Sequence, residues 1–421
     1  MNSHRFGSIE VRRYPLKNGL IVLLAHDPRA EIFAYHSWMR VGSKHEDPSK
    51  TGLAHLLEHL MFKATERHPL GFFDREIERR GAESNAATWV DWTYYHETLA
   101  HRDDNLRAVI ELEADRLTGL VLDDETFASE LAVVQNERRM TVDDSVLASL
   151  GEEVYRTAFT AHGYRWPTIG YAEHLESMTV DDVRSFYQQH YAPDQTVIVV
   201  AGDIDFESTL SLISAAYEHL TPSGYLHPGV SPEPEQESER RVEITRHSQT
   251  RYMTLAYRVP GQLDPAAPAV EALTELLFVG DNAQIYHALV TEAQLASDVE
   301  GYVTPFAEPG LCEMAITLRP GIKPDAVIDR VDRELRRLPG TLNQEMLEKA
   351  RNGLELSFLD SLRDADGLAE ALGHYEVAHG NFTEAFTGHE RARSVTVDAM
   401  RDTCERFFRP DNRTIGVVNL P

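Results

Sequence analysis

The chain has 421 residues, and its 68 acidic against 41 basic side chains give a formal net charge of −27. This excess of acid argues against a nucleic-acid partner, because binding to phosphates requires a basic face. No run of about 18 or more apolar residues exists, so we expect no membrane-spanning helix. Two cysteines are too few for a disulfide framework or a cysteine zinc site. The composition therefore predicts a soluble protein with more than one core.

Strand and helix signals alternate through the first half of the chain. The pair Asn18-Gly19 precedes an apolar run, which is typical of a hairpin turn that leads into a buried strand. Further strands are predicted at 32–41 and 93–99. Helical periodicity predicts helices over 51–65, 71–80, 103–119 and 124–142.

The second half repeats this arrangement coarsely. Strands are predicted near 242–247, 252–258 and 311–318, and helices near 266–278, 324–338, 343–361 and 395–408. Each half therefore reads as an α+β sandwich of a sheet and helices. The N-terminal residues carry no apolar segment of the kind found in a signal peptide. We expect a cytoplasmic location, or a periplasmic one if a leader has been removed.

An internal repeat indicates that the two halves are homologous. The segment 177–184 recurs at 394–401, and at the same spacing a Pro-Asp pair and an apolar strand follow both copies. A duplicated helix-turn-strand unit therefore closes each half. Between the halves, residues 221–239 are rich in proline, glycine and acid, which predicts an extended, solvated linker. We expect a first domain at 1–220, a linker at 221–240 and a second domain at 241–421.

The segment His55-Leu-Leu-Glu58-His59 carries the clearest chemical signal. On a helix, residues i and i+4 share a face, so both imidazoles can bind one metal ion. Zinc accepts neutral histidine nitrogens and lowers the pKa of a bound water to about 7. Glu58 is then the base that takes the proton of that water. The order H-x-x-E-H is the inverzincin pattern, although a purely structural helix with two surface histidines would carry the same letters.

A catalytic zinc ion needs a third protein ligand and leaves its fourth position to water. Glu130 and Glu137 lie two turns apart on the helix predicted at 124–142, so they project from the same face. Either carboxylate could be the ligand. Glutamates on a helix more often form a solvated acidic face, and the spacing alone does not choose among these readings.

Together these residues resemble the pitrilysin-type zinc metallopeptidases, a family of inverzincins that includes insulin-degrading enzyme, mitochondrial processing peptidase and short bacterial members. The resemblance implies that His55, His59 and Glu137 bind one zinc ion per chain, that Glu58 is the catalytic base and that Glu130 is a supporting catalytic residue. It runs from about residue 16 to the C-terminus. Further matches are Phe62-Lys-Ala-Thr65, Gly81-Ala-Glu-Ser-Asn-Ala86, Thr93-Tyr-Tyr95 and Pro167-Thr-Ile-Gly170.

The resemblance also implies a fold and a mode of substrate binding. The fold is a pair of homologous α/β sandwich domains that forms half of a four-domain clamshell, with no metal site in the second domain. Substrate would pair with an edge strand, whose substrate-binding residues are Asn85, Ala86, Ala87 and Thr88. Main-chain pairing tolerates many peptide sequences, because only side-chain pockets select among them. Without the family, this segment supports only a strand that follows a glycine turn.

One departure from the family pattern concerns stabilisation of the oxyanion. In the family an arginine, and a tyrosine seven residues later, contact the substrate, and the matching positions here hold Val290 and Ser297. Neither side chain replaces the missing donors, and loss of one such donor typically costs about 10²–10³ in rate. On a helix, the nearby Tyr286 and His287 would point in other directions.

We therefore interpret the chain as the zinc-bearing subunit of a heterodimeric endopeptidase for peptides or small unfolded polypeptides, whose zinc-less homologous partner supplies the arginine and tyrosine. One alternative is a homodimeric peptidase with a substitute donor. Another is a non-hydrolytic assembly or peptide-binding subunit, which has no need for His55, Glu58, His59 and Glu137 together. A structural zinc site is a third, but such a site usually has four protein ligands.

Overall fold

A computed structural model describes residues 2–280 and 282–421. It divides into two compact units, each assembled from separate segments of the chain. Unit 1 contains the chain up to Asn136 together with 167–230 and 359–386, and unit 2 contains 137–166, 231–358 and 387–421. Each unit combines one sheet with helices, which confirms the predicted α+β class. Within the described residues no helix is both long and apolar enough to cross a membrane.

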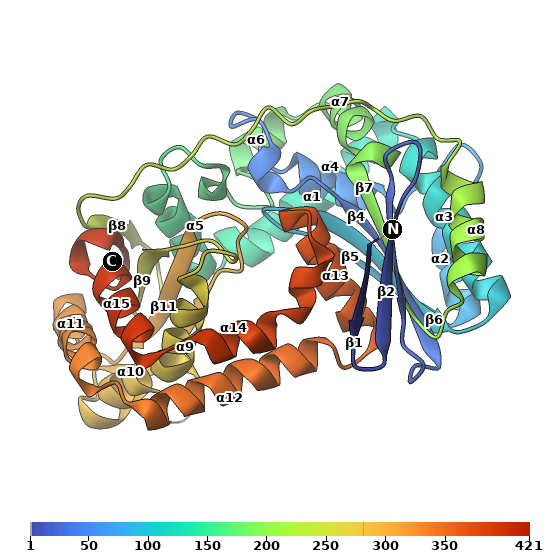
Figure 1. The fold of residues 1–421 in the computed structure, drawn as a ribbon. Coiled ribbons are helices and arrows are strands. Elements are labelled where there is room, and N and C mark those ends of the chain that lie inside the picture. The colour runs from blue at the N-terminus through green and yellow to red at the C-terminus, as the bar shows by residue number, and fades with distance from the viewer. Residues whose placement is uncertain (1, 281) are drawn as a thin grey trace. The chain divides into compact units, whose positions relative to one another are not determined.

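Unit 1 is built on a seven-stranded sheet in the order β1-β2-β3-β7-β4-β6-β5 (Figure 1). Strands β3 and β7 are parallel, and β5 pairs only with β6, so β5 forms one edge of the sheet. The hairpin of β1 and β2, which sequence analysis did not predict, extends the other edge. The strands are β1 (Asn2–Phe6), β2 (Ile9–Pro15), β3 (Ile21–His26), β4 (Ile32–Met39), β5 (Glu83–Thr88), β6 (Thr93–Ala100) and β7 (Thr196–Gly202).

The two faces of this sheet pack against different helices. Alternation along β4 sends Phe33, Tyr35 and Met39 into the main core, and His36 and Trp38 to the opposite face, where α13 packs on β4 and β7. The helices of unit 1 are α1 (Leu53–Leu60), α2 (Phe72–Arg80), α3 (Asp103–Gly119), α4 (Asp124–Arg138, up to Asn136 in this unit and continued in the other by a π-helical turn at Arg139–Asp143), α6 (Ala172–Ser177), α7 (Val180–His190), α8 (Phe206–Tyr217) and α13 (Ala365–His379).

Helix α1 is shorter than the predicted 51–65. It begins after Gly52, whose φ of 97° is left-handed and whose absent Cβ would lie 2.7 Å from the carbonyl oxygen of Ile169. This position therefore accepts only glycine. The helix ends at Leu60, because the chain beyond it pairs instead with the end of α3 through the bridge of Thr65 and Leu120.

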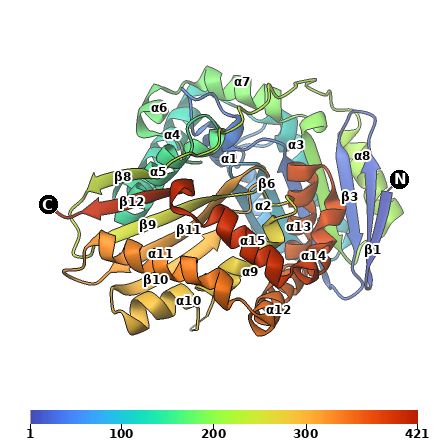
Figure 2. The same cartoon turned by 60° about the vertical axis from the view of Figure 1, so that its left-hand side comes forward.

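Unit 2 contains a five-stranded sheet in the order β10-β11-β9-β12-β8, with α9 and α15 packed on it and α5 contacting β12, β9 and β8 (Figure 2). Its strands are β8 (Arg240–Thr245), β9 (Tyr252–Val259), β10 (Ala296–Val303), β11 (Gly310–Leu318) and β12 (Arg413–Asn419). Its helices are α5 (Val146–Ala158), α9 (Ala267–Phe278), α10 (Gln284–Tyr286), α11 (Pro324–Thr341), α12 (Gln344–Ser361, up to Phe358 in this unit), α14 (Gly388–Ser394) and α15 (Val397–Phe407).

The repeat seen in the sequence has the same structure in both units. Helices α7 and α15 are each capped by a threonine, since Thr179 accepts from the Asp182 amide and Thr396 from the Ala399 amide. A 3-10 turn and a central strand follow each helix. Strand β7 pairs parallel to β3, and β12 pairs parallel to β8.

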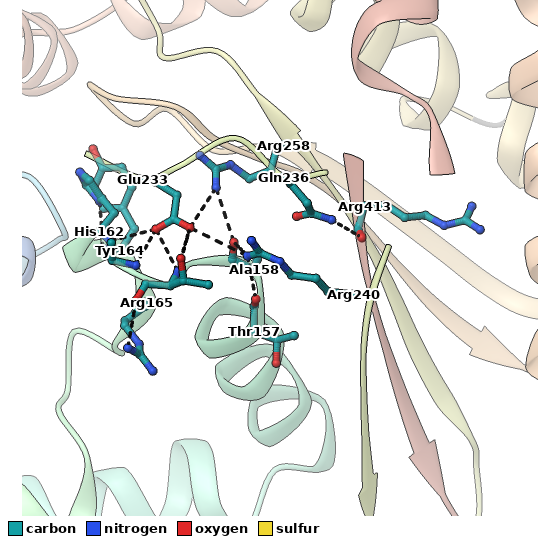
Figure 3. A network of polar contacts seen from close by, with 12 residues as sticks. Thr157, Ala158, His162, Tyr164, Arg165, Glu233, Gln236, Arg240, Arg258 and Arg413 are labelled. Atoms are coloured by element: carbon teal, nitrogen blue, oxygen red, sulfur yellow. Dashed lines mark hydrogen bonds and ion pairs between the residues drawn. The ribbon is translucent and has the colours of Figure 1, made fainter. Parts of the chain in front are cut away.

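The linker contains no helix or strand and most of its residues are exposed, but the side chain of Glu233 in its second part is buried against unit 2. The carboxylate of Glu233 accepts hydrogen bonds from the backbone amides of Thr160, Ala161 and His162, just beyond the end of α5. Arg258 and Arg240 approach the same carboxylate at 3.6 and 3.9 Å (Figure 3). The linker therefore becomes part of unit 2 well before β8 begins.

Candidate metal centre

Helix α1 carries three of the predicted site residues. Leu53, Leu56, Leu57 and Leu60 are buried in the core of unit 1, so the half-buried His55, Glu58 and His59 lie on the other side of the helix. The buried carboxyl of Glu46 accepts from the amides of Gly52 and Ala54 at 2.8 and 2.7 Å and so caps the first turn. Burial raises the pKa of Glu46 to about 8.

The structure brings His55, His59 and Glu137 together. One ligand atom from each lies within 4.8 Å of the other two, and the imidazole centroids are 4.8 Å apart. Burial, and then the neighbouring His59, lower the pKa of His55 to about 4, so this imidazole is neutral at pH 7. Two imidazoles and one carboxylate are a donor set that zinc uses in catalytic sites, with one position left open. The donors therefore fit the metal that the sequence predicted.

Glu130 lies beside this group and not within it. Its carboxylate is 2.8 Å from the Lys63 ammonium and 3.9 Å from His59 Nδ1, and the residue is 8% exposed. Both glutamates belong to α4, but only Glu137 reaches both histidines. Sequence analysis gave no role to Lys63, because the pairing of α4 with the end of α1 depends on tertiary structure.

The catalytic base predicted on α1 contacts the predicted substrate strand. The Thr88 hydroxyl, at the end of β5, donates a short hydrogen bond to Glu58 Oε2. Farther along β5, the exposed Asn85 accepts from the Ala86 amide through its side-chain oxygen at 2.9 Å. Ala86 and Ala87 are half-buried. The segment 85–88 is thus an edge strand whose last residue contacts Glu58, a link that no local sequence signal reveals.

Val290 and Ser297, which stand at the positions of the family's arginine and tyrosine, lie in different kinds of secondary structure. The helical conformation ends at Glu292, as a π-helical turn that follows α10, and the chain then turns at Gln294, where φ is 54°. Ser297 belongs to β10, and its hydroxyl donates to the Thr317 carbonyl at 3.3 Å. Tyr286 and His287 thus lie in helical conformation, whereas Ser297 lies in a strand.

Comparisons with known proteins show which family the chain resembles. The family model described as Insulinase (Peptidase family M16) matches residues 21–170, and the one described as Peptidase M16 inactive domain matches residues 177–354. Zinc protease PqqE of Helicobacter pylori is 28% identical, with 89% of this chain and 85% of that protein covered. Mitochondrial-processing peptidase subunit beta of Blastocladiella emersonii is 24% identical, with 97% and 88% covered.

Solved structures extend the likeness to the fold of the whole chain. The crystal structure of a protease from Helicobacter pylori has a TM-score of 0.92 at 26% identity, with 97% of this chain and 99% of that chain covered. A structure from Pseudomonas fluorescens, titled peptidase M16 inactive domain, shares the fold with a TM-score of 0.85 at 17% identity. With two models of one family matched in succession and these relatives matched nearly end to end, the chain belongs to peptidase family M16.

Proposed function

We propose that the protein is a zinc-dependent endopeptidase that hydrolyses peptides or small unfolded polypeptides. The observation that carries the proposal is the convergence of His55, His59 and Glu137 beside Glu58. An assembly or peptide-holding subunit has no physical need for three zinc donors and an adjacent base. Relatives named zinc proteases, such as that of Helicobacter pylori, add support.

Each residue of the site has a separate role in hydrolysis. A zinc ion held by His55, His59 and Glu137 would supply the Lewis acid that activates water at neutral pH. Glu58 accepts the proton of the attacking water. The hydroxyl of Thr88 donates to Glu58 Oε2, which holds the carboxylate in one orientation. The exposed edge of β5 pairs with the main chain of the peptide.

We further propose that the active form is a heterodimer with a homologous partner that has no zinc site. Val290 and Ser297 stand where the family has an arginine and a tyrosine, and the Ser297 hydroxyl is directed to the Thr317 carbonyl. The partner would then supply the two missing donors. The relative from Blastocladiella emersonii is itself named as a subunit.

Two glutamine substitutions test the metal and the base separately. Glu137→Gln should lose the zinc ion of this centre, whereas Glu58→Gln should keep that ion and lose peptide hydrolysis by several orders of magnitude. Glu125→Gln, in the first turn of α4, is the matched control for loss of one charge. Near-normal turnover by Glu58→Gln would refute the hydrolytic mechanism and favour the scaffold. Undiminished zinc in Glu137→Gln would point to another carboxylate, most directly Glu130.

A reconstitution experiment tests the partner. The purified chain alone should cleave unstructured peptides poorly. Addition of a zinc-less homologue that carries the arginine and tyrosine should raise the rate by roughly 10²-fold or more, which is the value of one oxyanion donor. Full activity of the isolated chain, unchanged by any partner, would establish the homodimeric alternative instead.

A further inference from the structure

A second group of potential metal ligands lies within unit 1, on the face of the sheet that α13 covers. His36 on β4 and His96 on β6 are directly opposed in the antiparallel register, with ring centroids 5.3 Å apart. Directly opposed residues on one face of a sheet bring their side chains close together. Asp366, in the first turn of α13, reaches both rings from the helix.

The distances in this group are close to those of a metal site. Asp366 Oδ1 is 2.9 Å from His36 Nε2 and 3.0 Å from His96 Nδ1, and the three ligand atoms all lie within 4.8 Å of one another. Bonds of about 2.0–2.1 Å to a tetrahedral zinc ion keep ligand atoms roughly 3.3–3.4 Å apart. Two of the three separations, those from Asp366 to each histidine, therefore need to grow by only a few tenths of an ångström for an ion to fit, and rotation of the side chains can supply such a change.

The group is buried at His36 and partly exposed at His96 and Asp366. The His36 side chain is fully buried, whereas those of His96 and Asp366 are 20% and 38% exposed. Tyr94 stacks on His36 with ring centroids 5.4 Å apart, which holds the imidazole in place. Glu370 follows Asp366 by one turn of α13, so it lies on the same face of the helix.

We propose that His36, His96 and Asp366 form a second binding site for a divalent transition metal of the zinc class, with Glu370 or water as the fourth ligand. The ion would join a helix from the end of the chain to two strands from its beginning. Its role is structural, because the donors come from a sheet and a helix that it fastens together. The site is independent of the proposed catalytic centre, with which it shares no ligand.

The tautomer of His36 predicts that this second ion binds more weakly than the ion of the proposed catalytic centre. His36 Nδ1 is buried and has no hydrogen-bond partner among the described residues, so in the metal-free form the proton resides on Nε2 and is donated to Asp366. Metal binding at Nε2 moves that proton to Nδ1, where it has no acceptor. Histidine ligands normally donate their second N–H, and loss of such a contact costs about 10–100-fold in affinity.

Zinc stoichiometry tests the proposal. The full chain is saturated with zinc chloride, freed of unbound metal and analysed for zinc per chain. Wild-type protein should hold two ions, and His96→Gln and Asp366→Asn should each hold one. His101→Asn, a change at an exposed histidine just beyond β6, is the control and should hold two. During titration with a chelator, wild type should release its two ions in separate steps. The first of these steps should be absent in His96→Gln.

The His55→Ala/His59→Ala variant separates this site from the catalytic one. It should retain one zinc ion, which His96→Gln then removes. One zinc per chain in saturated wild type, unaffected by His96→Gln and Asp366→Asn, would overturn the proposal and leave a hydrogen-bonded His-Asp-His group. If the catalytic centre bound no metal, wild type would hold one ion and His96→Gln none. Failure of the proposed function can therefore be distinguished from failure of the second site. Loss of an ion in His101→Asn would indicate adventitious surface binding and would also overturn it.

Discussion

Glu233→Gln should destabilise unit 2 by removing one negative charge from a buried carboxylate. The Glu233 side chain is 3% exposed and accepts from the amides of Thr160, Ala161 and His162 at 2.8–2.9 Å. Backbone hydrogen bonds outweigh the effect of burial, so the pKa of Glu233 lies below its usual value. Its stabilising contribution is therefore present at neutral pH and is lost as pH falls below about 4.5.

The magnitude follows from the number of contacts that an amide cannot keep. A hydrogen bond to a charged group contributes about 1.5–3 kcal/mol, and the glutamine NH₂ group would face a backbone N–H. Loss of one to two such bonds predicts a destabilisation of about 3 kcal/mol. For a unit of 150–250 residues this lowers Tm by roughly 6–12 °C. Arg240 keeps its bonds to the carbonyls of Thr157 and Ala158, which limits the loss.

Hydrogen exchange followed by mass spectrometry gives a local readout. The peptide that covers 159–163 should exchange about 10²-fold faster in Glu233→Gln, since 1.4 kcal/mol corresponds to a factor of ten. Glu237→Gln makes the same change of charge at an exposed position of the linker and should match wild type. Unchanged exchange in Glu233→Gln, or equal acceleration in Glu237→Gln, would refute the assignment of Glu233 as the anchor of the linker.

Three further predictions concern unit 1. Burial lowers the pKa of His190 to about 3, so its own contribution, measured as the difference between wild type and His190→Gln in thermal denaturation, should be constant above pH 6.5 and become less favourable below it, by about 2 kcal/mol at pH 5. Gly373→Ala would set a Cβ 2.1 Å from the indole nitrogen of Trp38, so urea denaturation should show a loss of about 1–3 kcal/mol; an unchanged midpoint would contradict this packing. Thr88→Val should leave zinc content unchanged but lower kcat/KM about 10–100-fold, whereas Thr88→Ser should retain activity; equal activity of both variants would exclude a positioning role for the bond to Glu58.

Local patterns predicted the parts of the site that depend on short spacing. The i and i+4 relation of His55 and His59 and the seven-residue spacing of the two glutamates follow from helical geometry alone. The contacts of Thr88 with Glu58 and of Lys63 with Glu130 could not be predicted, because they join elements whose packing depends on the whole core. The β1–β2 hairpin was missed for another reason, since its first strand is mostly exposed and carries little apolar alternation.

The sequence did not predict that the two halves exchange segments, because periodicity identifies a helix without indicating which sheet it covers. Helix α5 lies within the first half of the sequence but packs on the sheet of unit 2, and α13 comes late in the chain but packs on the sheet of unit 1. The linker was predicted as solvated because its composition is polar. The binding of its second part to unit 2 depends on Glu233, which accepts hydrogen bonds from three amides of a distant loop.

The late position of α13 has a consequence for how the protein is made. On the ribosome, the last strand of the unit 1 sheet, β7, is complete at Gly202, but the helix that covers Trp38 and Tyr94 ends only at His379. At a translation rate of about 5–20 residues per second, these aromatic side chains stay uncovered for on the order of 10 to 40 s before α13 has been synthesised. During that time the nascent chain presents an apolar sheet face that chaperones would recognise. An expressed fragment that stops at the linker would keep that face exposed permanently, so it should aggregate even though its strands are all present.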